Sequence, residues 1–294
     1  MIIVKIVGGL GNQLFQYAFA RSVSAHLKTD FKLDISPFNS GYKLHKYSLN
    51  YFNVKKSIAK DSDFFGFVWI RKHSKIFDIF YKYIRLKSTL LPFYYPEQMF
   101  HFDNSVFLKN KTYFDGFWQT EKYFKDIDFE LRKEITLKNP LSTYSEELLK
   151  KIKNSPSVSI HVRRGDYVTD QNTNIVHGTC SMEYYKKAID HVTKKVAGSH
   201  FFIFSDDYDW SIENFKSLNH PFTCVKNDAE KNYEDLILMS NCKHNIIANS
   251  SFSWWGAWLN PNKEKIVIAP KKWFNTEKTT TNTEDIVPES WVKM

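Results

Sequence analysis

The pattern of apolar and polar positions at the N-terminus predicts a strand, a tight turn, a helix and a second strand. Residues 2–7 are mostly β-branched, which is typical of a buried strand. A glycine-rich turn follows, and apolar residues then recur at helical spacing over residues 12–27. Residues 31–35 predict the next strand. This order indicates a βαβ unit, in which a helix joins two parallel strands.

The second half of the chain shows the same alternation. It begins after prolines at 140 and 156 have interrupted the periodicity. Strands are expected at residues 157–162, 201–204, 244–248 and 265–269, and helices at residues 145–153, 182–196, 233–240 and 252–259. Strands that alternate with helices pair in parallel and are covered on both faces. We therefore predict an α/β protein with two Rossmann-like domains, whose parallel sheets face a central cleft.

The middle of the chain is less regular. Residues 43–110 are rich in Phe, Tyr and Lys and show mixed periodicity, which we interpret as a variable insertion suited to acceptor binding. Residues 113–118 then predict a strand, and residues 121–137 a helix. We expect an N-terminal, acceptor-side domain over residues 1–148 and a C-terminal domain over residues 149–294.

Charge, cysteine content and hydropathy exclude several classes of protein and site. Lys and Arg number 41 against 32 Asp and Glu, a formal net charge of +9, which suits an anionic ligand or an anionic membrane surface. No nucleic-acid partner is expected, because the basic residues form no stripe with interleaved aromatics. The three cysteines include no CxxC pair, so neither a zinc site nor a disulfide framework is indicated. Because no signal peptide or membrane-spanning stretch is found, we expect a cytoplasmic protein, with peripheral contact with the inner membrane compatible with its charge.

Polar clusters follow four of the predicted strands, at the sheet edge where open parallel sheets bind ligands. The first is the turn that contains Gly9, Gly11, Asn12 and Gln13. Glycine lets the backbone approach a ligand closely, and the start of the following helix offers N–H groups to phosphate or sugar oxygens. The GGxG pattern is weak, and by itself it favours an ordinary turn between strand and helix.

The second cluster, HVRRGDY, contains His161, Arg163, Arg164 and Asp166. An arginine here can bind a diphosphate through two parallel N–H bonds, and so replace a metal ion in neutralising a departing nucleoside diphosphate. A surface salt bridge between Arg164 and Asp166 is the structural alternative. Two adjacent arginines at the end of a buried strand are costly unless paired, which favours a functional role for the cluster.

The third cluster consists of Ser205, Asp206 and Asp207. A carboxylate there can accept hydrogen bonds from a guanine edge or from ribose hydroxyls, although one of the two aspartates is expected to cap the next helix. No histidine or third acid is spaced to complete a metal site, so no metal is predicted.

The fourth cluster is a polar turn that leads from a strand into a helix. Its members are Asn249, Ser250, Ser251 and Phe252. Hydroxyl groups and helix N–H groups in such a turn can hold a phosphate. Trp255 and Trp258, which follow, are expected in the core.

Taken in order, GGLGNQLFQYA, HVRRGDY, FSDD and ANSSFSWWGAWL resemble the motifs of the family 11 glycosyltransferases, the α-1,2-fucosyltransferases. The stretch GFWQTEKYF at residues 116–124 is similar to the GYWQSEKYF stretch of bacterial members. The matches run from residue 8 to residue 259 and leave out the region from 43 to 110. The resemblance implies a GT-B-like pair of Rossmann domains and an inverting enzyme that needs neither a metal nor another cofactor.

The resemblance also implies substrates and roles. The donor would be GDP-β-L-fucose, bound by the C-terminal domain, and the acceptor the 2-hydroxyl of a galactose-terminated oligosaccharide or lipid-linked glycan in surface polysaccharide or O-antigen synthesis. Arg163 would grip the β-phosphate, with His161 beside the nucleotide. The aspartates of the third cluster would face guanine or ribose, the two serines of the fourth would touch phosphate, and Gly11 and Asn12 would line the fucose pocket.

The sequence leaves the catalytic base and two other functions open. Inverting transfer usually needs a base for the acceptor proton, for which Asp166 and Glu121 are candidates. A base-free route through a loose, oxocarbenium-like transition state is the alternative. The other functions are those of a different GDP-sugar-dependent fucosyltransferase, which would lack the SSFSWWGAW run, and of a non-catalytic nucleotide- or glycan-binding protein.

Overall fold

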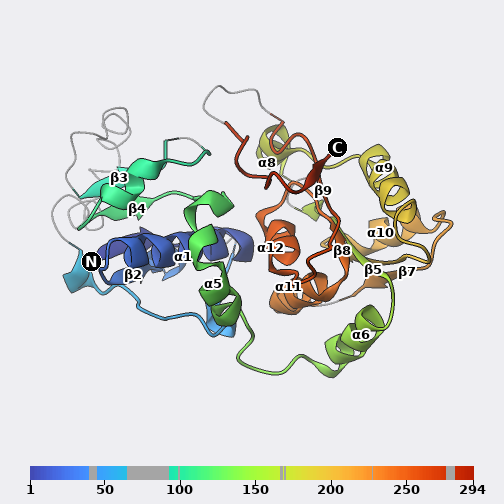
Figure 1. Ribbon diagram of the computed structural model, residues 1–294, viewed down its shortest axis with the longest axis horizontal. Coiled ribbons are helices and arrows are strands. Elements are labelled where there is room, and N and C mark those ends of the chain that lie inside the picture. The colour runs from blue at the N-terminus through green and yellow to red at the C-terminus, as the bar shows by residue number, and fades with distance from the viewer. Residues whose placement is uncertain are drawn as a thin grey trace. The chain divides into compact units, whose positions relative to one another are not determined.

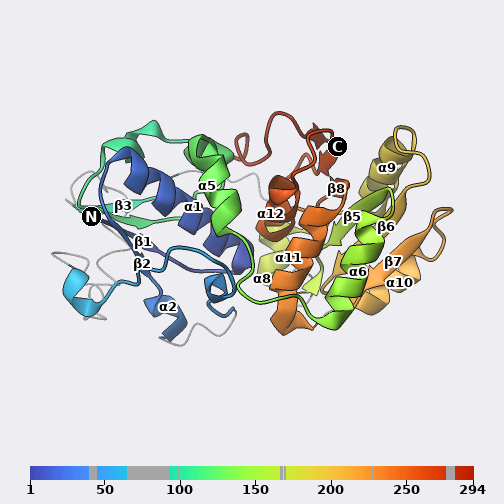
Figure 2. The same cartoon turned by 60° about the horizontal axis from the view of Figure 1, so that its bottom comes forward.

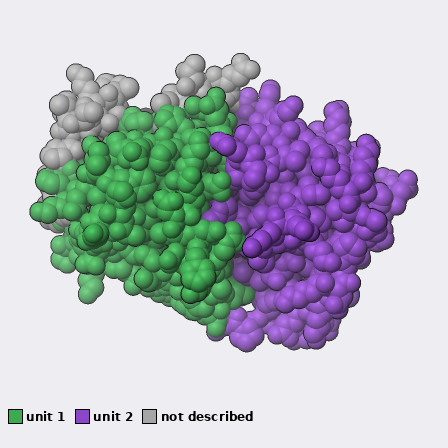
Figure 3. Space-filling view, in the orientation of Figure 1, with its two compact units in different colours: residues 1–138, 282–286 green, residues 139–281, 287–294 purple. Residues whose placement is uncertain are grey.

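The computed structural model describes residues 1–39, 45–64, 93–98, 100–165, 168, 170–226, 228–275 and 282–294. The chain folds into two compact units, which Figure 3 colours separately. Unit 1 comprises Met1–Lys138 and Asn282–Ile286, and unit 2 comprises Asn139–Thr281 and Val287–Met294. Each unit has a parallel sheet of its own with helices packed on it, which confirms the predicted α/β class (Figures 1 and 2).

Unit 1 is built on a four-stranded sheet with the strand order β2-β1-β4-β3. All adjacent pairs are parallel, and the strands are β1 (Ile2–Lys5), β2 (Phe31–Asp34), β3 (Tyr94–Pro96) and β4 (Tyr113–Asp115). Helix α1 (Leu10–His26) connects β1 to β2 and is buried over most of its length. The predicted βαβ unit is therefore confirmed.

The other elements of unit 1 are short. They are α2 (Ser36–Asn39), the 3₁₀ turns η1 (Leu49–Tyr51), η2 (Asp61–Asp63), η4 (Asn104–Leu108), η5 (Glu121–Tyr123) and η6 (Lys125–Ile127), and helix α5 (Asp128–Glu134). Residues 65–92 of the expected insertion lie outside the described residues. The single helix expected over 121–137 is wrong, because Tyr123 and Phe124 both turn onto α1, against Phe19 and Phe15.

The strand expected over 113–118 is also shorter than predicted, since β4 ends at Asp115. Gly116 follows, and Trp118 has a φ of +57°, a left-handed conformation that no strand residue adopts. The Trp118 ring is buried and stacks on Phe19, with 4.1 Å between the ring centroids. Burial of this ring stabilises the sharp turn after β4.

Unit 2 contains a six-stranded sheet with the order β10-β9-β8-β5-β6-β7, and every adjacent pair is parallel. The strands are β5 (Ser157–Val162), β6 (His200–Ser205), β7 (Phe222–Val225), β8 (His244–Ile246), β9 (Val267–Ala269) and β10 (Val292–Lys293). The helices are α6 (Thr143–Lys153), α8 (Gln171–His177), α9 (Met182–Thr193), α10 (Tyr208–Phe215), α11 (Asn232–Asn241) and α12 (Ser251–Leu259).

Strand β6 shows how the unit 2 sheet is covered on both faces. Phe201 and Ile203 share a buried cluster with residues of α9 and α10, whereas Phe202 and Phe204 share another with α6 and α11. Successive side chains of a strand point to opposite faces, so a continuous apolar run is needed when both faces are buried. The expected burial of Trp255 and Trp258 in α12 is confirmed as well.

The two units divide at Lys138, earlier than the boundary expected between residues 148 and 149. That boundary falls inside α6, whose Leu148 and Ile152 belong to the core cluster that contains residues of β6. Packing of this amphipathic helix therefore assigns it to unit 2, and the division falls next to Pro140.

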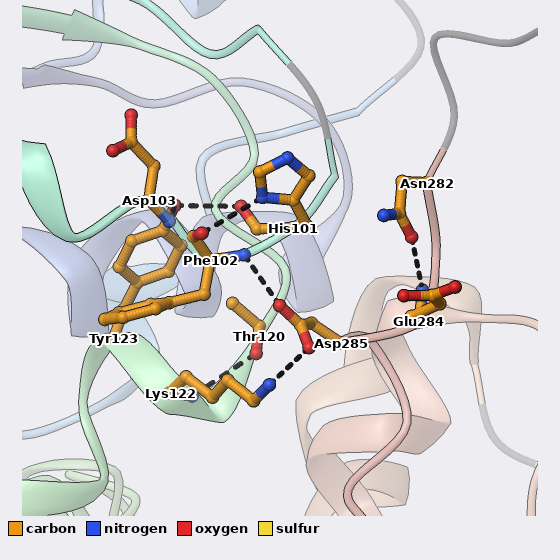
Figure 4. A network of polar contacts seen from close by, with 9 residues as sticks. All are labelled: His101, Phe102, Asp103, Thr120, Lys122, Tyr123, Asn282, Glu284 and Asp285. Atoms are coloured by element: carbon orange, nitrogen blue, oxygen red, sulfur yellow. Dashed lines mark hydrogen bonds and ion pairs between the residues drawn. The ribbon is translucent and has the colours of Figure 1, made fainter.

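Residues 282–286 belong to unit 1, although the segments on either side of them belong to unit 2. Asp285 fastens this segment, since its carboxylate accepts the backbone N–H of Phe102 at 2.8 Å and pairs with the Lys122 ammonium group (Figure 4). The chain then returns to unit 2 to form β10. No helix in the described part of the chain has the length and hydrophobicity needed to cross a bilayer.

Candidate functional site

In unit 2, three polar loops lie at the carboxyl ends of β5, β6 and β8. These strands are parallel neighbours, with β5 paired to β6 on one side and to β8 on the other. The loops that follow them carry the second, third and fourth clusters predicted from the sequence. Because the carboxyl ends of parallel strands share one edge, these clusters are close in space although far apart in sequence.

Arg163 is held by Asp206 at this edge. Its Nη1 lies 2.7 Å from Oδ2 of Asp206, and the backbone N–H of Arg164 donates to Oδ1 of the same carboxylate at 2.8 Å. Gly165 allows this approach, because a Cβ at that position would lie 2.6 Å from Oδ2. Both side chains keep about a quarter of their surface exposed, 25% for Arg163 and 26% for Asp206, so the guanidinium is both oriented and accessible.

The second arginine pairs with the second aspartate. Nε of Arg164 lies 3.0 Å from Oδ2 of Asp207, and its guanidinium carbon lies 4.1 Å from the centroid of the Trp210 ring. Asp207 also caps α10, since Oδ1 accepts the Trp210 N–H at 3.2 Å, and its own N–H donates to the Ser205 hydroxyl at 3.0 Å. The expected helix cap is therefore confirmed. The structure gives Asp207 as the partner of Arg164, whereas Asp166 lies outside the described residues.

His161, the last but one residue of β5, is 5% exposed and packs beside Phe252, with 5.5 Å between the ring centroids. Burial lowers the pKa of its imidazole to about 4, and the positive charge of Arg163 adds to this, although Asp206 opposes it. The ring is therefore neutral at pH 7. Its Nδ1 is buried and has no hydrogen-bond partner among the described residues, so it is an unused polar group beside Arg163.

The turn before α12 contains one residue whose position favours a structural role. Asn249 is 4% exposed, and its Nδ2 donates to the backbone oxygens of His177, Gly178 and Trp273 at 2.9, 3.3 and 3.2 Å. Asn249 thus joins three segments of the chain. Its side-chain N–H groups are used in these bonds and are not available for the predicted contact with the donor substrate. Sequence reasoning could not separate this role from binding.

Ser250 and Ser251 start helix α12. Ser250 is the N-cap residue, yet its hydroxyl makes no cap hydrogen bond, and Ser251 is half-buried. The first N–H groups of a helix lack partners within the helix and carry a partial positive charge. The start of α12 is therefore suited to an anionic ligand, as the sequence predicts.

In unit 1 the glycine turn lies at the carboxyl end of β1. Gly8 has a φ of +87°, and a Cβ there would lie 2.6 Å from Nδ2 of Asn12. Gly9 is the N-cap of α1, and Gly11 is buried in its first turn. The turn thus needs glycine at residue 8 for its own geometry, in addition to any contact with a ligand.

Gln13 is committed to the backbone of unit 1. It is fully buried, and its Nε2 donates to the carbonyl oxygens of Gly8 and Lys46, both at 2.8 Å. Its Oε1 accepts the Ser48 N–H at 2.8 Å. Gln13 therefore holds the glycine turn to residues 46–48. Both hydrogens of its side-chain amide are used in these bonds, so neither is available for the predicted contact with the donor substrate.

Two amide side chains that the sequence analysis did not single out join the loops after β1 and β4. Gln16 accepts the Val7 N–H at 2.9 Å and donates to the Gly116 carbonyl oxygen at 3.0 Å. Gln119 donates to Oδ1 of Asn12 at 2.8 Å, while its own Oε1 is buried without a partner among the described residues. Both loops carry motif residues, so this sheet edge is a second polar site.

Two carboxylates lie at or near the unit 1 edge. Glu121, a candidate base, is half-buried at the start of η5. Glu97 follows β3 and accepts the N–H groups of Phe117 and Trp118 at 2.7 and 3.0 Å. Burial raises the pKa of Glu97 to about 7, and the two backbone bonds oppose the rise. Glu97 falls in the region from 43 to 110, where the sequence carries no recognisable signal.

Within the described residues, no three His, Cys, Asp or Glu side chains are grouped so as to hold a metal ion, and Cys180, Cys224 and Cys242 are free thiols. The charged groups that gather at the unit 2 edge are Arg163, Arg164 and their two aspartates.

Comparison with solved structures identifies the class of fold. The chain is similar to the fucosyltransferase NodZ from Bradyrhizobium, with a TM-score of 0.53 and 15% identity over 87% of this chain and 91% of that one. A second structure, NodZ α-1,6-fucosyltransferase soaked with GDP-fucose, has a TM-score of 0.51 and 15% identity over 88% and 92% of the two chains. The fold is therefore that of a GT-B-like glycosyltransferase.

Sequence comparison identifies the family. Residues 92–294 match the model of glycosyl transferase family 11. The chain is 35% identical to an α-1,2-colitosyltransferase of Escherichia coli, over 100% of this chain and 99% of that protein. It is 34% identical to the O-antigen biosynthesis glycosyltransferase WbnK of Escherichia coli, over 98% of both, and 26% identical to rat galactoside α-(1,2)-fucosyltransferase 1, over 49% of this chain and 40% of that protein. This chain belongs to glycosyltransferase family 11.

Proposed function

We propose that this glycosyltransferase moves L-fucose from GDP-β-L-fucose to the 2-hydroxyl of a terminal galactoside, with inversion at the anomeric carbon. The observation that carries the donor assignment is the oriented, accessible guanidinium of Arg163, which lies at the same sheet edge as the start of α12. Both offer N–H groups at one sheet edge, and a leaving nucleoside diphosphate needs such groups. The α-1,2 linkage is supported by the names of the relatives in Escherichia coli and rat.

In this proposal unit 2 binds the donor and unit 1 the acceptor. The bond from the anomeric carbon to the β-phosphate breaks as the acceptor oxygen attacks, and charge builds up on the departing GDP. Hydrogen-bond donors that are oriented before the reaction stabilise such charge without rearranging. Arg163 would therefore act mainly in the transition state. No metal is assigned to this step.

A second donor deserves a direct comparison, because a relative 35% identical to this chain is an α-1,2-colitosyltransferase. Colitose is L-fucose without its 3-hydroxyl, so the two nucleotide sugars share every phosphate and guanine contact. An enzyme distinguishes them by a polar group that binds the 3-hydroxyl, or by an apolar group that fills its place.

The proposed setting is a cytoplasmic enzyme of surface polysaccharide or O-antigen synthesis that acts on a lipid-linked glycan. Its formal charge of +9 suits peripheral contact with an anionic membrane. The alternatives remain another GDP-sugar-dependent fucosyltransferase and a non-catalytic binding protein.

Product analysis tests the proposal. The purified protein is incubated with GDP-fucose or GDP-colitose and a panel of β-galactosides, with Arg163→Ala as the inactive control. The expected result is GDP release with a new fucose whose position, read by mass spectrometry and NMR, is O2 of galactose. Transfer from GDP-colitose alone would contradict the donor, a different linkage would contradict the acceptor, and GDP binding without release would favour the binding protein.

A further inference from the structure

Glu97 is a carboxylate at the ligand-binding edge of the unit 1 sheet. It directly follows β3, which pairs with β4, and β4 pairs with β1. The carboxyl ends of these three parallel strands therefore form one continuous edge, with Glu97 at one end and the glycine turn at the other. Glu97 is half-buried, so part of its side chain remains open to a ligand.

The Glu97 side chain is oriented by the turn that opens the GFWQTEKYF motif. Oε2 accepts the Phe117 N–H at 2.7 Å, and Oε1 accepts the Trp118 N–H at 3.0 Å. Gly116 makes room for it, because a Cβ there would lie 2.4 Å from the Cβ of Glu97. Each carboxylate oxygen has two lone pairs, and the backbone uses one of each, so both oxygens can still accept a hydrogen bond from a ligand.

Other carboxylates of unit 1 have partners that commit them to structure. Asp115 is paired with Lys5 at 3.1 Å and accepts the Tyr94 hydroxyl at 2.8 Å. Glu134 is bound by Arg21 at 2.8 Å and by the Tyr17 hydroxyl at 2.5 Å, and these partners lower its pKa. Glu97 is held by backbone N–H groups, which orient a carboxylate without adding a positive charge.

The surroundings of Glu97 favour a group that exchanges a proton near neutral pH. Its pKa is raised to about 7, chiefly by burial and also by the charge of Asp115 of β4, against the lowering effect of the two backbone N–H groups and of His101. Burial raises the pKa of the Tyr123 phenol in η5, and the charge of Glu97 adds to this rise. A general base works best when its pKa lies close to the operating pH.

The same edge offers contacts to a sugar. The turn that Glu97 orients leads to Gln119, which reaches across to Asn12 and leaves its own Oε1 without a partner among the described residues. A buried acceptor of this kind is costly unless a donor such as a sugar hydroxyl satisfies it. Glu97 and the amide pair thus lie on loops of the same sheet edge.

We propose that Glu97 is the general base of the transfer reaction and takes the proton from the attacking hydroxyl of the acceptor sugar. As the O–H bond breaks, the acceptor oxygen forms its bond to the anomeric carbon of the donor. The bond from that carbon to the phosphate oxygen breaks, and the nucleoside diphosphate leaves with the electron pair. Glu97 then passes its proton to water. This role rests on the proposed function, in which a sugar hydroxyl attacks the anomeric carbon of a nucleoside diphosphate sugar.

The test measures transfer rates with two acceptors, in the Glu97→Gln variant and in the wild type. One is the normal acceptor sugar, and the other carries a thiol in place of the attacking hydroxyl. A thiol is partly ionised in mildly alkaline buffer and needs no base. The variant should lose about 10²–10⁴-fold in transfer to the hydroxyl acceptor, the usual contribution of general base catalysis. It should keep most of the wild-type rate with the thiol. Glu130→Gln, at an exposed carboxylate of α5, is the matched control and should leave both rates unchanged.

An equal loss on both acceptors would overturn the proposal, since it would mean that Glu97 only holds the turn at Phe117 and Trp118. If the variant does not fold, the wild type still decides the matter. Its kcat/KM with the hydroxyl acceptor should fall as the pH drops below about 7, the pKa of Glu97, and a flat profile would contradict the proposal. All rates are measured with a donor and an acceptor that the wild type uses. A wrong donor or linkage in the proposed function would therefore appear in the product analysis, and would not change the ratio of variant to wild-type rates.

Discussion

Arg163 and Asp206 face each other across the carboxyl ends of β5 and β6, with 2.7 Å between Nη1 and Oδ2. This pairing changes the role expected for the aspartate. In the proposed mechanism Arg163 binds the β-phosphate, which ribose and the α-phosphate separate from guanine in GDP. A carboxylate in contact with Arg163 would then be poorly placed to face the base. We therefore propose that Asp206 positions Arg163. The contact of Asp206 or Asp207 with guanine or ribose that the sequence led us to expect stays a prediction.

Replacing Arg163 by Ala should abolish transfer while the protein stays folded. A guanidinium that stabilises the leaving diphosphate acts in the transition state, so kcat should fall by about 10²–10³-fold, the usual effect of losing one such donor. Arg163→Lys should rescue poorly, because an ammonium group cannot reproduce the planar fork. Steady-state kinetics with circular dichroism as the folding control checks this, and activity within about tenfold of the wild type would exclude the role.

Asp206→Asn should lower kcat through Arg163 and leave the preference for GDP over ADP unchanged. If the aspartate acts only by orienting the arginine, the double variant with Arg163→Ala should be no slower than Arg163→Ala alone. Calorimetric titration with GDP and ADP provides the second readout. A selective loss of GDP affinity would instead restore the guanine-reading role.

Chelators should leave activity intact, because in the proposed mechanism Arg163 and the start of α12 supply the charge stabilisation that a metal would otherwise provide. Rates are measured in EDTA and again after addition of Mn²⁺ or Mg²⁺. Loss of activity in EDTA that either ion restores would show that the reaction is metal-dependent.

Gln13→Leu should affect stability more than catalysis. The substitution leaves the carbonyl oxygens of Gly8 and Lys46 and the N–H of Ser48 without their partner. Unsatisfied groups of this kind cost roughly 1–3 kcal/mol each, so the free energy of unfolding should fall by about 3 kcal/mol or more. Urea unfolding measures the loss, and GDP affinity is measured in parallel. Unchanged stability with weaker GDP binding would return Gln13 to the donor site.

His161 should make the fold sensitive to acid. Its pKa is about 4 in the folded protein against 6.5 for the free group. Between these values the unfolded chain binds a proton that the native state excludes, so stability is lost as the pH falls from about 6.5 towards 4. His161→Gln should flatten this part of the curve of unfolding free energy against pH. An identical curve for the variant would mean that protonation of the His161 imidazole in the native state does not lower the free energy of unfolding.

The sequence was informative wherever a signal is local. The continuous apolar run in β6, the amphipathic spacing of α9 and the cap at Asp207 each depend on neighbouring residues. They therefore predicted the α/β class and most elements of unit 2, whereas the family resemblance came from the motifs. The GFWQTEKYF motif was visible too, but its turn was missed, because the left-handed conformation of Trp118 is stabilised by stacking on a residue of α1.

The identity of the polar partners could not be predicted in the same way. Gln13 and Asn249 lie in motifs as conspicuous as that of Arg163, yet both side chains bind backbone groups that are distant in sequence. Asn249 donates to the carbonyl oxygen of His177, 72 residues away, and Gln13 to that of Lys46. Glu97 carries no sequence signal at all. Its raised pKa results from burial, and the two N–H groups that orient it and oppose the rise come from the turn after β4.

The sequence by itself determined the alternation of strands and helices, and with it the sheet edges at which polar residues could gather. Only the tertiary structure decided which of those residues are committed to the fold and which remain oriented and accessible. The physical reason is that secondary structure follows from periodicity along the chain, whereas hydrogen-bond partners, burial and pKa depend on groups brought together from distant segments.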